Sequence, residues 1–313
     1  MNNPLGIIDA IVLGLVEGIT EALPVSSTGH LVVTASLLGL DSPDTVKTAM
    51  DTLLIVIQGG AILAVLWLFR KSVCQMILGL LGRNLEGLRL ARNIIIAFLP
   101  AAILGPLLDD WIESRLMHPE PVLLALGLGG LVMVASDRRL RGKQKASLKG
   151  SELTAIAALQ IGLLQCVAMW PGTSRLMMTL LGGMLVGMRP AAAARFSFLL
   201  ALPTIGGATV WKLLKNTMSD QPDMFSVLGW TPVLIGLGVA AIATYFTVTW
   251  LLSYLNTHGL KAFGWYRIGL TAVLVGLVLG GVVVIGSESD HLAAGTDSAD
   301  STIPLIPIAS TRG

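Results

Sequence analysis

Long apolar stretches recur along the chain, and six of them have the composition of membrane-spanning helices. A helix needs about 20 mostly apolar residues to cross the hydrocarbon core of a bilayer. The six predicted spans cover about residues 52–69, 93–108, 120–136, 195–211, 230–250 and 268–286. The pattern therefore predicts an all-α polytopic membrane protein with about six transmembrane helices.

Two further apolar regions differ from these spans because proline, glycine, serine and charged residues interrupt them. They cover about residues 5–40 and 152–190. The segment 287–313 is polar and is expected to be a disordered tail. We therefore expect residues 1–286 to form a single integral membrane domain.

The composition agrees with a chain surrounded by lipid. Only 13% of the residues are charged and 54% are apolar, whereas soluble domains carry about 25% charged residues. The net charge of +2 gives no indication of nucleic acid as a partner. Cys74 and Cys166 lie far apart in or near apolar segments, which makes a disulfide framework unexpected.

The basic residues predict the topology. Most of the 21 Lys and Arg residues fall in four predicted loops, at 70–92, 137–150, 189–195 and 256–267. The positive-inside rule places these loops in the cytoplasm, and both termini then lie outside. Regions 5–40 and 152–190 must each return to the side on which they start, so both are predicted to be re-entrant helical hairpins. Irregular backbone at membrane depth needs protein or a wet cavity beside it, and two such hairpins predict a central polar cavity.

A shift of 147 residues aligns Pro24 with Pro171 and Ser27 with Ser174. Because the predicted topology gives the two halves opposite orientations, this similarity indicates an inverted repeat, with copies at about 5–136 and 152–286. In membrane proteins built this way, the functional site lies near the midplane between the copies.

The first interrupted region gathers ionisable and hydroxyl side chains within a short apolar stretch. Glu17 and Glu21 share one face of a helix that Pro24 ends. The polar residues that follow are Ser26, Ser27, Thr28 and His30. A charge at bilayer depth costs about 2.5–3.5 kcal/mol on insertion scales, so the cluster indicates a functional site.

The second interrupted region carries Thr173, Ser174 and Arg175 after a Pro-Gly pair. The planar guanidinium of Arg donates two parallel hydrogen bonds to a phosphate, and hydroxyls and free turn amides add anion-binding capacity. Together the two regions offer a nucleophile, a base or metal ligand, a proton carrier and a phosphate clamp. A phosphoryl-transfer site needs these parts.

Structural roles are the competing interpretation. Glu17 and Glu21 could be neutralised by an arginine without taking part in chemistry. For Thr20, Ser36 and Thr179 we prefer the simpler role, in which each hydroxyl bonds its own helix backbone.

At these residues the chain resembles the undecaprenyl-diphosphate phosphatases linked to bacitracin resistance. The resemblance rests on residues 17–31, which read EGITEALPVSSTGHL, and on residues 171–175, which read PGTSR. Weaker similarity extends over most of the chain to about residue 285. The family usually continues the second motif with Ser and a small residue, whereas Leu176 and Met177 follow here, which removes one hydroxyl from the second turn.

The resemblance implies hydrolysis of undecaprenyl diphosphate to the monophosphate at the outer side of the bacterial inner membrane. This reaction recycles the lipid carrier of peptidoglycan synthesis and gives bacitracin resistance. The resemblance also implies a divalent cation, Mg²⁺ or Ca²⁺, with Glu17 and Glu21 as its ligands. Ser27 would be the nucleophile, Glu21 its activator, and Glu17 and His30 ligands or proton carriers. The residues expected to hold the diphosphate are Arg175, Ser26, Thr28, Thr173 and Ser174.

The residues leave two alternatives open. The attacking group is either Ser27 or a metal-bound water. The function could also be that of a polyprenyl-phosphate transporter or flippase, because transporters use inverted repeats and broken helices; a transporter, however, needs no poised serine. The expected partners are the polyprenyl diphosphate and membrane lipids, and a homodimer is possible.

Overall fold

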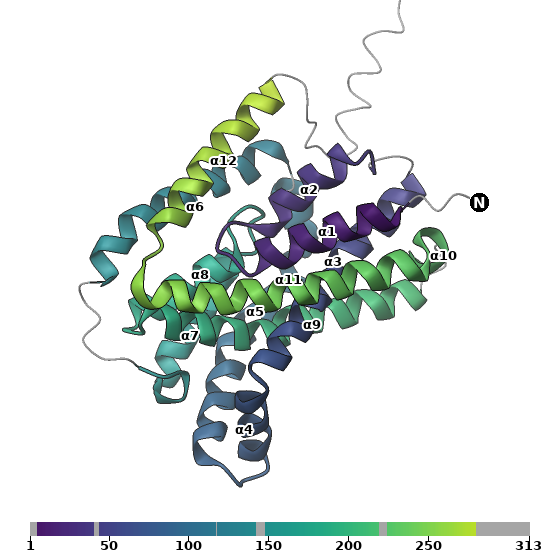
Figure 1. Ribbon diagram of the computed structural model, residues 1–313. Coiled ribbons are helices and arrows are strands. Elements are labelled where there is room, and N and C mark those ends of the chain that lie inside the picture. The colour runs from purple at the N-terminus through teal and green to yellow at the C-terminus, as the bar shows by residue number, and fades with distance from the viewer. Residues whose placement is uncertain (1–4, 41–43, 117, 142–147, 219–223, 280–313) are drawn as a thin grey trace, which may run out of the picture.

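The computed structural model describes residues 5–40, 44–116, 118–141, 148–218 and 224–279, and the regular elements in these ranges are all helices (Figure 1). The first half contains α1 (Ile7–Glu21), α2 (Ser27–Leu37), α3 (Asp44–Leu68), α4 (Arg70–Leu80), α5 (Leu85–Leu116) and α6 (Pro119–Arg141). After a short 3-10 turn (Gly150–Glu152), the second half contains α7 (Ala155–Val167), α8 (Arg175–Leu185), α9 (Pro190–Met218), α10 (Met224–Leu228), α11 (Trp230–Thr257) and α12 (Lys261–Leu279).

The six predicted spans correspond in order to α3, α5, α6, α9, α11 and α12. Among the described residues, five helices are long and apolar enough to cross a membrane, and α3 and α4 form a sixth candidate that bends by 78°. The prediction of an all-α polytopic membrane protein is therefore confirmed. The last span begins earlier than expected, at Lys261, and residues 280–286 and the predicted tail at 287–313 lie outside the described residues.

Each half begins with two short helices joined by an irregular turn. The helices of the first pair, α1 and α2, have 15 and 11 residues, and those of the second pair, α7 and α8, have 13 and 11. None of the four reaches the roughly 20 residues that a span needs. They form the two predicted hairpins, whose re-entry into the membrane stays a prediction.

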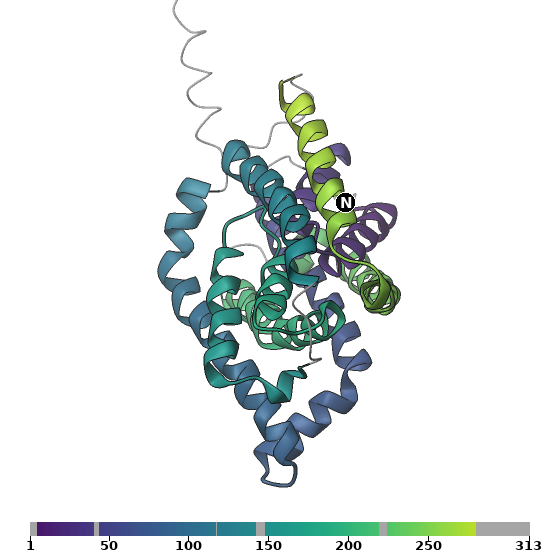
Figure 2. The same ribbon diagram turned by 90° about the vertical axis from the view of Figure 1, so that its left-hand side faces the viewer.

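Each hairpin packs against the long helix of the opposite half. Helix α1 lies along α11, and α7 lies along α5 (Figure 1). In the turned view, the teal helices of the second half lie between two blue arms formed by α3 with α4 and by α5 (Figure 2). Packing of each hairpin on the other half is what a two-fold relation between the halves produces. It also brings the two hairpin turns together in the centre.

The 147-residue shift seen in the sequence relates α3 to α9, because a Cβ on Gly59 would meet Thr209 and a Cβ on Gly206 would meet Ile62. In the hairpins, where this shift aligns the prolines of two irregular turns, the helical register is 148 residues, the separation between Ser27 and Arg175, the first residues of α2 and α8. Position 14 in α1 then corresponds to position 162 in α7, and both are glycines that contact the backbone of the partner helix.

The outer surface of the bundle is apolar. Exposed large side chains include Trp67, Trp111, Trp211 and Trp250. Such an extent of apolar surface is expected where a chain contacts lipid instead of water.

The predicted loop at 256–267 is wrong in its extent. Residues 256–267 were expected to form a basic loop, but α11 continues to Thr257 and α12 begins at Lys261. Arg267 consequently lies within α12 and is completely buried. Its charge does not anchor a loop in the cytoplasm.

Replacing Gly14 or Gly162 with alanine is expected to destabilise the protein by about 1–3 kcal/mol, the usual cost of overpacking. A Cβ on Gly14 would overlap the carbonyl oxygen of Gly236, and a Cβ on Gly162 would overlap that of Ala97. Gly238→Ala is the matched control, because a Cβ there meets nothing within 4 Å. Thermal unfolding in detergent measures the difference, and equal midpoints for Gly14→Ala and Gly238→Ala would contradict this packing.

Candidate active site

A cavity of about 250 Å³ lies between the two hairpin turns. Its polar lining comes from both turns and from α3 and α9, which cross beside them. The polar side chains that line it are those of Thr20, Glu21, Ser26, Ser27, Thr28, Gln58, Ser174, Arg175 and Thr204. Two segments about 150 residues apart in the sequence thus form one concave polar surface.

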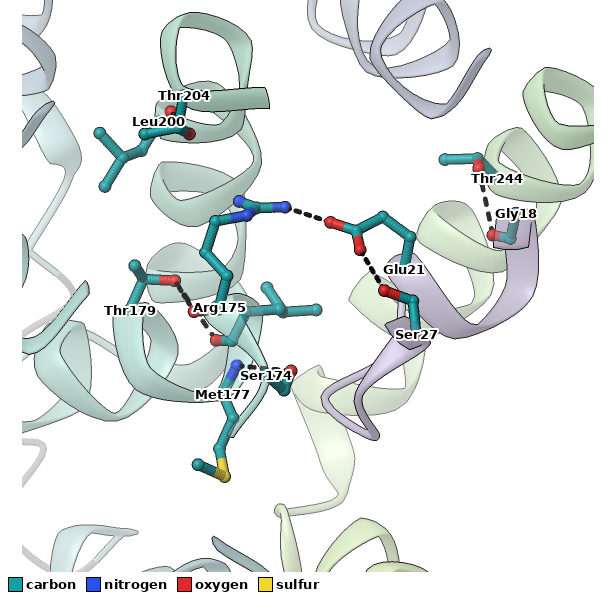
Figure 3. A network of polar contacts seen from close by, with 11 residues as sticks. Gly18, Glu21, Ser27, Ser174, Arg175, Met177, Thr179, Leu200, Thr204 and Thr244 are labelled. Atoms are coloured by element: carbon teal, nitrogen blue, oxygen red, sulfur yellow. Dashed lines mark hydrogen bonds and ion pairs between the residues drawn. The ribbon is translucent and has the colours of Figure 1, made fainter. Parts of the chain in front are cut away.

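Glu21 connects the two turns across this cavity. Its Oε2 atom accepts a hydrogen bond of 2.7 Å from the hydroxyl of Ser27, and its Oε1 atom accepts one of 2.5 Å from Nη2 of Arg175 (Figure 3). Both charged side chains are largely shielded from solvent, with 15% of Glu21 and 17% of Arg175 exposed. The carboxylate is placed to accept a proton from Ser27 and is held there by a cation from the other half.

Both turns contain a serine with a positive φ angle just before the next helix. Ser26 and Ser174 adopt positive φ angles of 75° and 67°, and each immediately precedes the first residue of the following helix. A left-handed conformation is unfavourable for a residue with a side chain, and such strain is concentrated at functional sites. The positive φ of the preceding serine turns the chain into the next helix, so Ser27 and Arg175 become the equivalent first residues of α2 and α8.

These two helix N-termini favour an anion in the cavity. The first residues of α2 (Ser27 and Thr28) and of α8 (Arg175 and Leu176) all line it. The first turn of a helix leaves backbone N–H groups without intrahelical partners and carries partial positive charge. Two N-termini, a guanidinium and several hydroxyls therefore suit a phosphate group.

His30 does not line the cavity. Its Nδ1 atom lies 2.7 Å from the carbonyl oxygen of Ser26, and its Nε2 atom lies 2.8 Å from the hydroxyl of Tyr266. Because a carbonyl can only accept, Nδ1 carries the proton, and when the ring is neutral Nε2 accepts from the Tyr266 hydroxyl. In this arrangement His30 supports the backbone of the first turn, and neither of its ring nitrogens bonds Ser27.

Glu17 and Thr173 also lie outside the cavity lining. Glu17 is completely buried, and neither of its carboxyl oxygens has a hydrogen-bond partner in the described part of the chain. The equivalent position in α7 is Gln165, which is 3% exposed and likewise lacks partners there. The hydroxyl of Thr173 donates to the carbonyl oxygen of Trp170 and closes the second turn.

Three of the polar lining residues named above, Thr20, Gln58 and Thr204, were not among the predicted site residues. Gln58 could have been found, because an amide in the middle of an apolar span is expensive unless it is used. Thr204 and Thr20 gave no such signal, since each hydroxyl donates to a carbonyl of its own helix, Leu200 and Val16 respectively.

The carboxylates suit a divalent cation only if the substrate supplies further ligands. Within the described ranges, no group of three or more His, Cys, Asp or Glu side chains could hold a metal ion. Glu17 and Glu21 are one helical turn apart, and the two oxygens of Glu17 are unsatisfied. Because Mg²⁺ is often bound by one or two carboxylates together with substrate phosphates, this donor set fits a cation brought in with a diphosphate.

Comparisons with known proteins identify relatives over most of the chain. The family model described as bacitracin resistance protein BacA matches residues 10–273. A protein of Sorangium cellulosum named undecaprenyl-diphosphatase is 44% identical over 273 residues, which cover 86% of this chain and 85% of that protein. Proteins named undecaprenyl-diphosphatase 1 of Burkholderia thailandensis and undecaprenyl-diphosphatase 2 of Rhodospirillum rubrum are 43% and 40% identical, covering 85% and 88% of this chain and 94% and 97% of their own lengths.

The strain at Ser26 predicts different effects for two small substitutions. Ser26→Ala keeps a side chain at a positive φ and loses the hydroxyl, whereas Ser26→Gly loses the hydroxyl and relieves the strain. Since a left-handed residue with a Cβ costs about 1–2 kcal/mol, the glycine variant is expected to be more stable than the alanine variant by about that amount. Thermal unfolding of both variants tests this, and equal stabilities would show that the turn stores no strain at this residue.

Proposed function

This chain belongs to the bacitracin resistance protein BacA family, and we propose from this membership and from the cavity that it hydrolyses undecaprenyl diphosphate to undecaprenyl phosphate and inorganic phosphate. The protein is thus an integral-membrane phosphatase of the inner membrane, acting on a cell-wall lipid carrier. The hydrogen-bonded series Ser27–Glu21–Arg175 carries the proposal, because it combines a nucleophile, a base and a phosphate ligand in one cavity. The flippase alternative is not favoured, since the relatives are named as diphosphatases.

Ser27 is proposed as the nucleophile. Its oxygen forms a bond to the terminal phosphorus while the anhydride bond to undecaprenyl phosphate breaks, and its proton passes to Oε2 of Glu21, which already accepts its hydrogen bond. Glu21 then releases this proton to the departing undecaprenyl phosphate or to solvent. Water attacks the phosphoserine while the ionised Glu21 takes a proton from that water, the P–O bond to Ser27 breaks, and Glu21 returns the proton to the Ser27 oxygen as free phosphate leaves. Each step breaks and forms one P–O bond, so the sum is hydrolysis.

Arg175 is proposed to exchange partners when the substrate enters. Its Nη2 atom bonds Glu21, and its buried Nη1 atom has no partner in the described part of the chain. An unsatisfied buried donor is costly, and a phosphate oxygen would satisfy it. Engagement of the guanidinium by the diphosphate would release Oε1 of Glu21 from its bond to Arg175.

The remaining polar residues are proposed to complete the phosphate site. Ser26, Thr28, Ser174 and Gln58 line the same cavity and offer hydroxyl and amide donors. Thr173 and His30 contribute indirectly, because their hydrogen bonds stabilise the two turns.

We further propose that a divalent cation, Mg²⁺ or Ca²⁺, accompanies the substrate. Glu17 and Glu21 would hold it, and it would neutralise charge on the diphosphate. The topology is proposed from the sequence: both termini outside, with the cavity opening to the outer side. A homodimer stays a prediction.

Phosphate release from undecaprenyl diphosphate by the protein purified in detergent tests the function. Wild type is expected to be active and to lose activity with a chelator. Ser27→Ala is expected to lose nearly all of it, and Glu21→Gln to lose about 10²–10⁴-fold, the usual contribution of a general base. Ser253→Ala is the control, because Ser253 is exposed on α11 far along the chain from both turns. Activity that survives in Ser27→Ala would assign the attack to water, and a folded but inactive wild type would overturn the proposed function.

Cysteine labelling in spheroplasts tests the topology. Cys74 is exposed on α4, and in a Cys166→Ala background an impermeant maleimide is expected to label it only after the membrane is permeabilised. Ser114→Cys near the end of α5, combined with Cys74→Ser and Cys166→Ala, is expected to react without permeabilisation. The reverse pattern would invert the proposed orientation.

A further inference from the structure

Arg267 is a buried cation that pairs with backbone carbonyls instead of a carboxylate. It lies in α12 with 0% exposure, and the ion pairs formed by the described residues do not include it. Burying a charge costs several kcal/mol unless excellent hydrogen bonds offset the loss of hydration. A role in binding the substrate does not explain this buried charge, because Arg267 does not line the cavity.

The guanidinium of Arg267 reaches both hairpin turns and α6. Nη2 donates to the carbonyl oxygen of Gly172 at 2.7 Å, and Nη1 lies 3.4 Å from that of Pro24. The guanidinium also donates hydrogen bonds to the carbonyl oxygens of Thr173 at 3.5 Å, Ala125 at 3.3 Å and Leu126 at 3.1 Å. A single side chain therefore joins three segments that are remote in sequence.

The two turn carbonyls occupy equivalent places. Pro24 lies three residues before Ser27, and Gly172 lies three residues before Arg175. Helix α6 leaves room for this contact, since a Cβ on Gly129 would lie only 3.0 Å from Cζ of Arg267. The guanidinium thus fixes matching points of the two turns relative to each other.

Tyr266, the preceding residue of α12, supports the first turn through His30. Its hydroxyl lies 2.8 Å from Nε2 of His30, and the two rings stack with centroids 5.8 Å apart. The other nitrogen of His30 donates to the carbonyl oxygen of Ser26, the residue with a φ of 75°. Adjacent side chains of one helix therefore hold the turn at two points, Pro24 and Ser26.

We propose that Tyr266 and Arg267 are positioning residues that hold the two hairpin turns in the geometry of the reaction. The proposal rests on the proposed function, because it assigns them to the placement of Ser27 and Arg175. It also explains how the two turns keep their relative placement when the substrate binds. The Glu21–Arg175 pair joins the turns directly, and the diphosphate competes for it, whereas the carbonyl contacts of Arg267 are untouched by the substrate.

Kinetic measurements on Arg267→Lys and Tyr266→Phe test the proposal, with Arg89→Lys, an exposed position on α5, as the control. A lysine cannot reach several carbonyls at once, and misplacement by about 1 Å costs about 10²-fold in rate. We expect kcat to fall by about that factor in Arg267→Lys, and by about fivefold in Tyr266→Phe, which loses one hydrogen bond. The KM for undecaprenyl diphosphate is expected to stay near the wild-type value in both. A raised KM with an unchanged kcat would instead make these residues substrate ligands and overturn the proposal.

Combination with Ser27→Ala separates positioning from an independent effect. A residue that acts through Ser27 is expected to add no further loss in the Ser27→Ala background, because residues acting as a unit are not additive. A full additional loss would contradict the proposal. Tyr266→Phe carries this test alone if thermal unfolding shows that Arg267→Lys does not fold.

A distance measurement gives a readout that does not depend on activity. Spin labels at Leu37→Cys and Leu185→Cys, the exposed last residues of α2 and α8, report the relative placement of the hairpins in a Cys74→Ser, Cys166→Ala background. We expect a narrow distance distribution in the parent and a broader one in Arg267→Lys. An unchanged distribution would refute the positioning role even if the proposed reaction itself were wrong, and a broader distribution in an inactive parent would refute only the proposed reaction.

Discussion

The ion pair between Glu21 and Arg175 is the constraint around which the centre of the molecule is arranged. The two charges come from opposite halves of the chain and lie in a largely enclosed cavity. Either charge alone would be poorly compensated there, so the hairpins are stable in this position only when they face each other. The same pair couples substrate binding to the base, because an anion that binds Arg175 changes the electrostatic environment of Glu21 beside Ser27.

Two kinds of contact therefore hold the turns, and they differ in how easily they exchange. A carboxylate–guanidinium contact can be replaced by a phosphate–guanidinium contact of similar strength. The contacts of Arg267 to backbone carbonyls of Pro24 and Gly172 have no such competitor. The exchangeable contact faces the cavity and the permanent one lies behind it, which allows the front of the site to rearrange while its frame stays fixed.

The sequence predicted much of this arrangement where the signals are local. The lengths of the apolar stretches predicted the helices α3, α5, α6, α9, α11 and α12. The polar cluster from Glu17 to His30 predicted the first turn. In the hairpins, the 147-residue shift differs by one from the 148 residues between the first residues of α2 and α8, because it aligned the prolines of two irregular turns. Arg267 was taken for a loop residue because hydropathy alone could not show that a charge in α12 would meet five carbonyl oxygens from α6 and the two turns. His30 was expected to carry protons, and only the structure shows that both of its ring nitrogens already have partners.

The correspondence between Glu17 and Gln165 has a consequence for the symmetry of the molecule. The two side chains occupy equivalent buried positions and lack hydrogen-bond partners within the described residues, yet only Glu17 is ionisable. In a symmetric dimer of identical chains, equivalent positions carry the same residue, so an acid at this position would be buried twice. Because both hairpins belong to one polypeptide, one of them can carry an acid where the other carries a neutral amide.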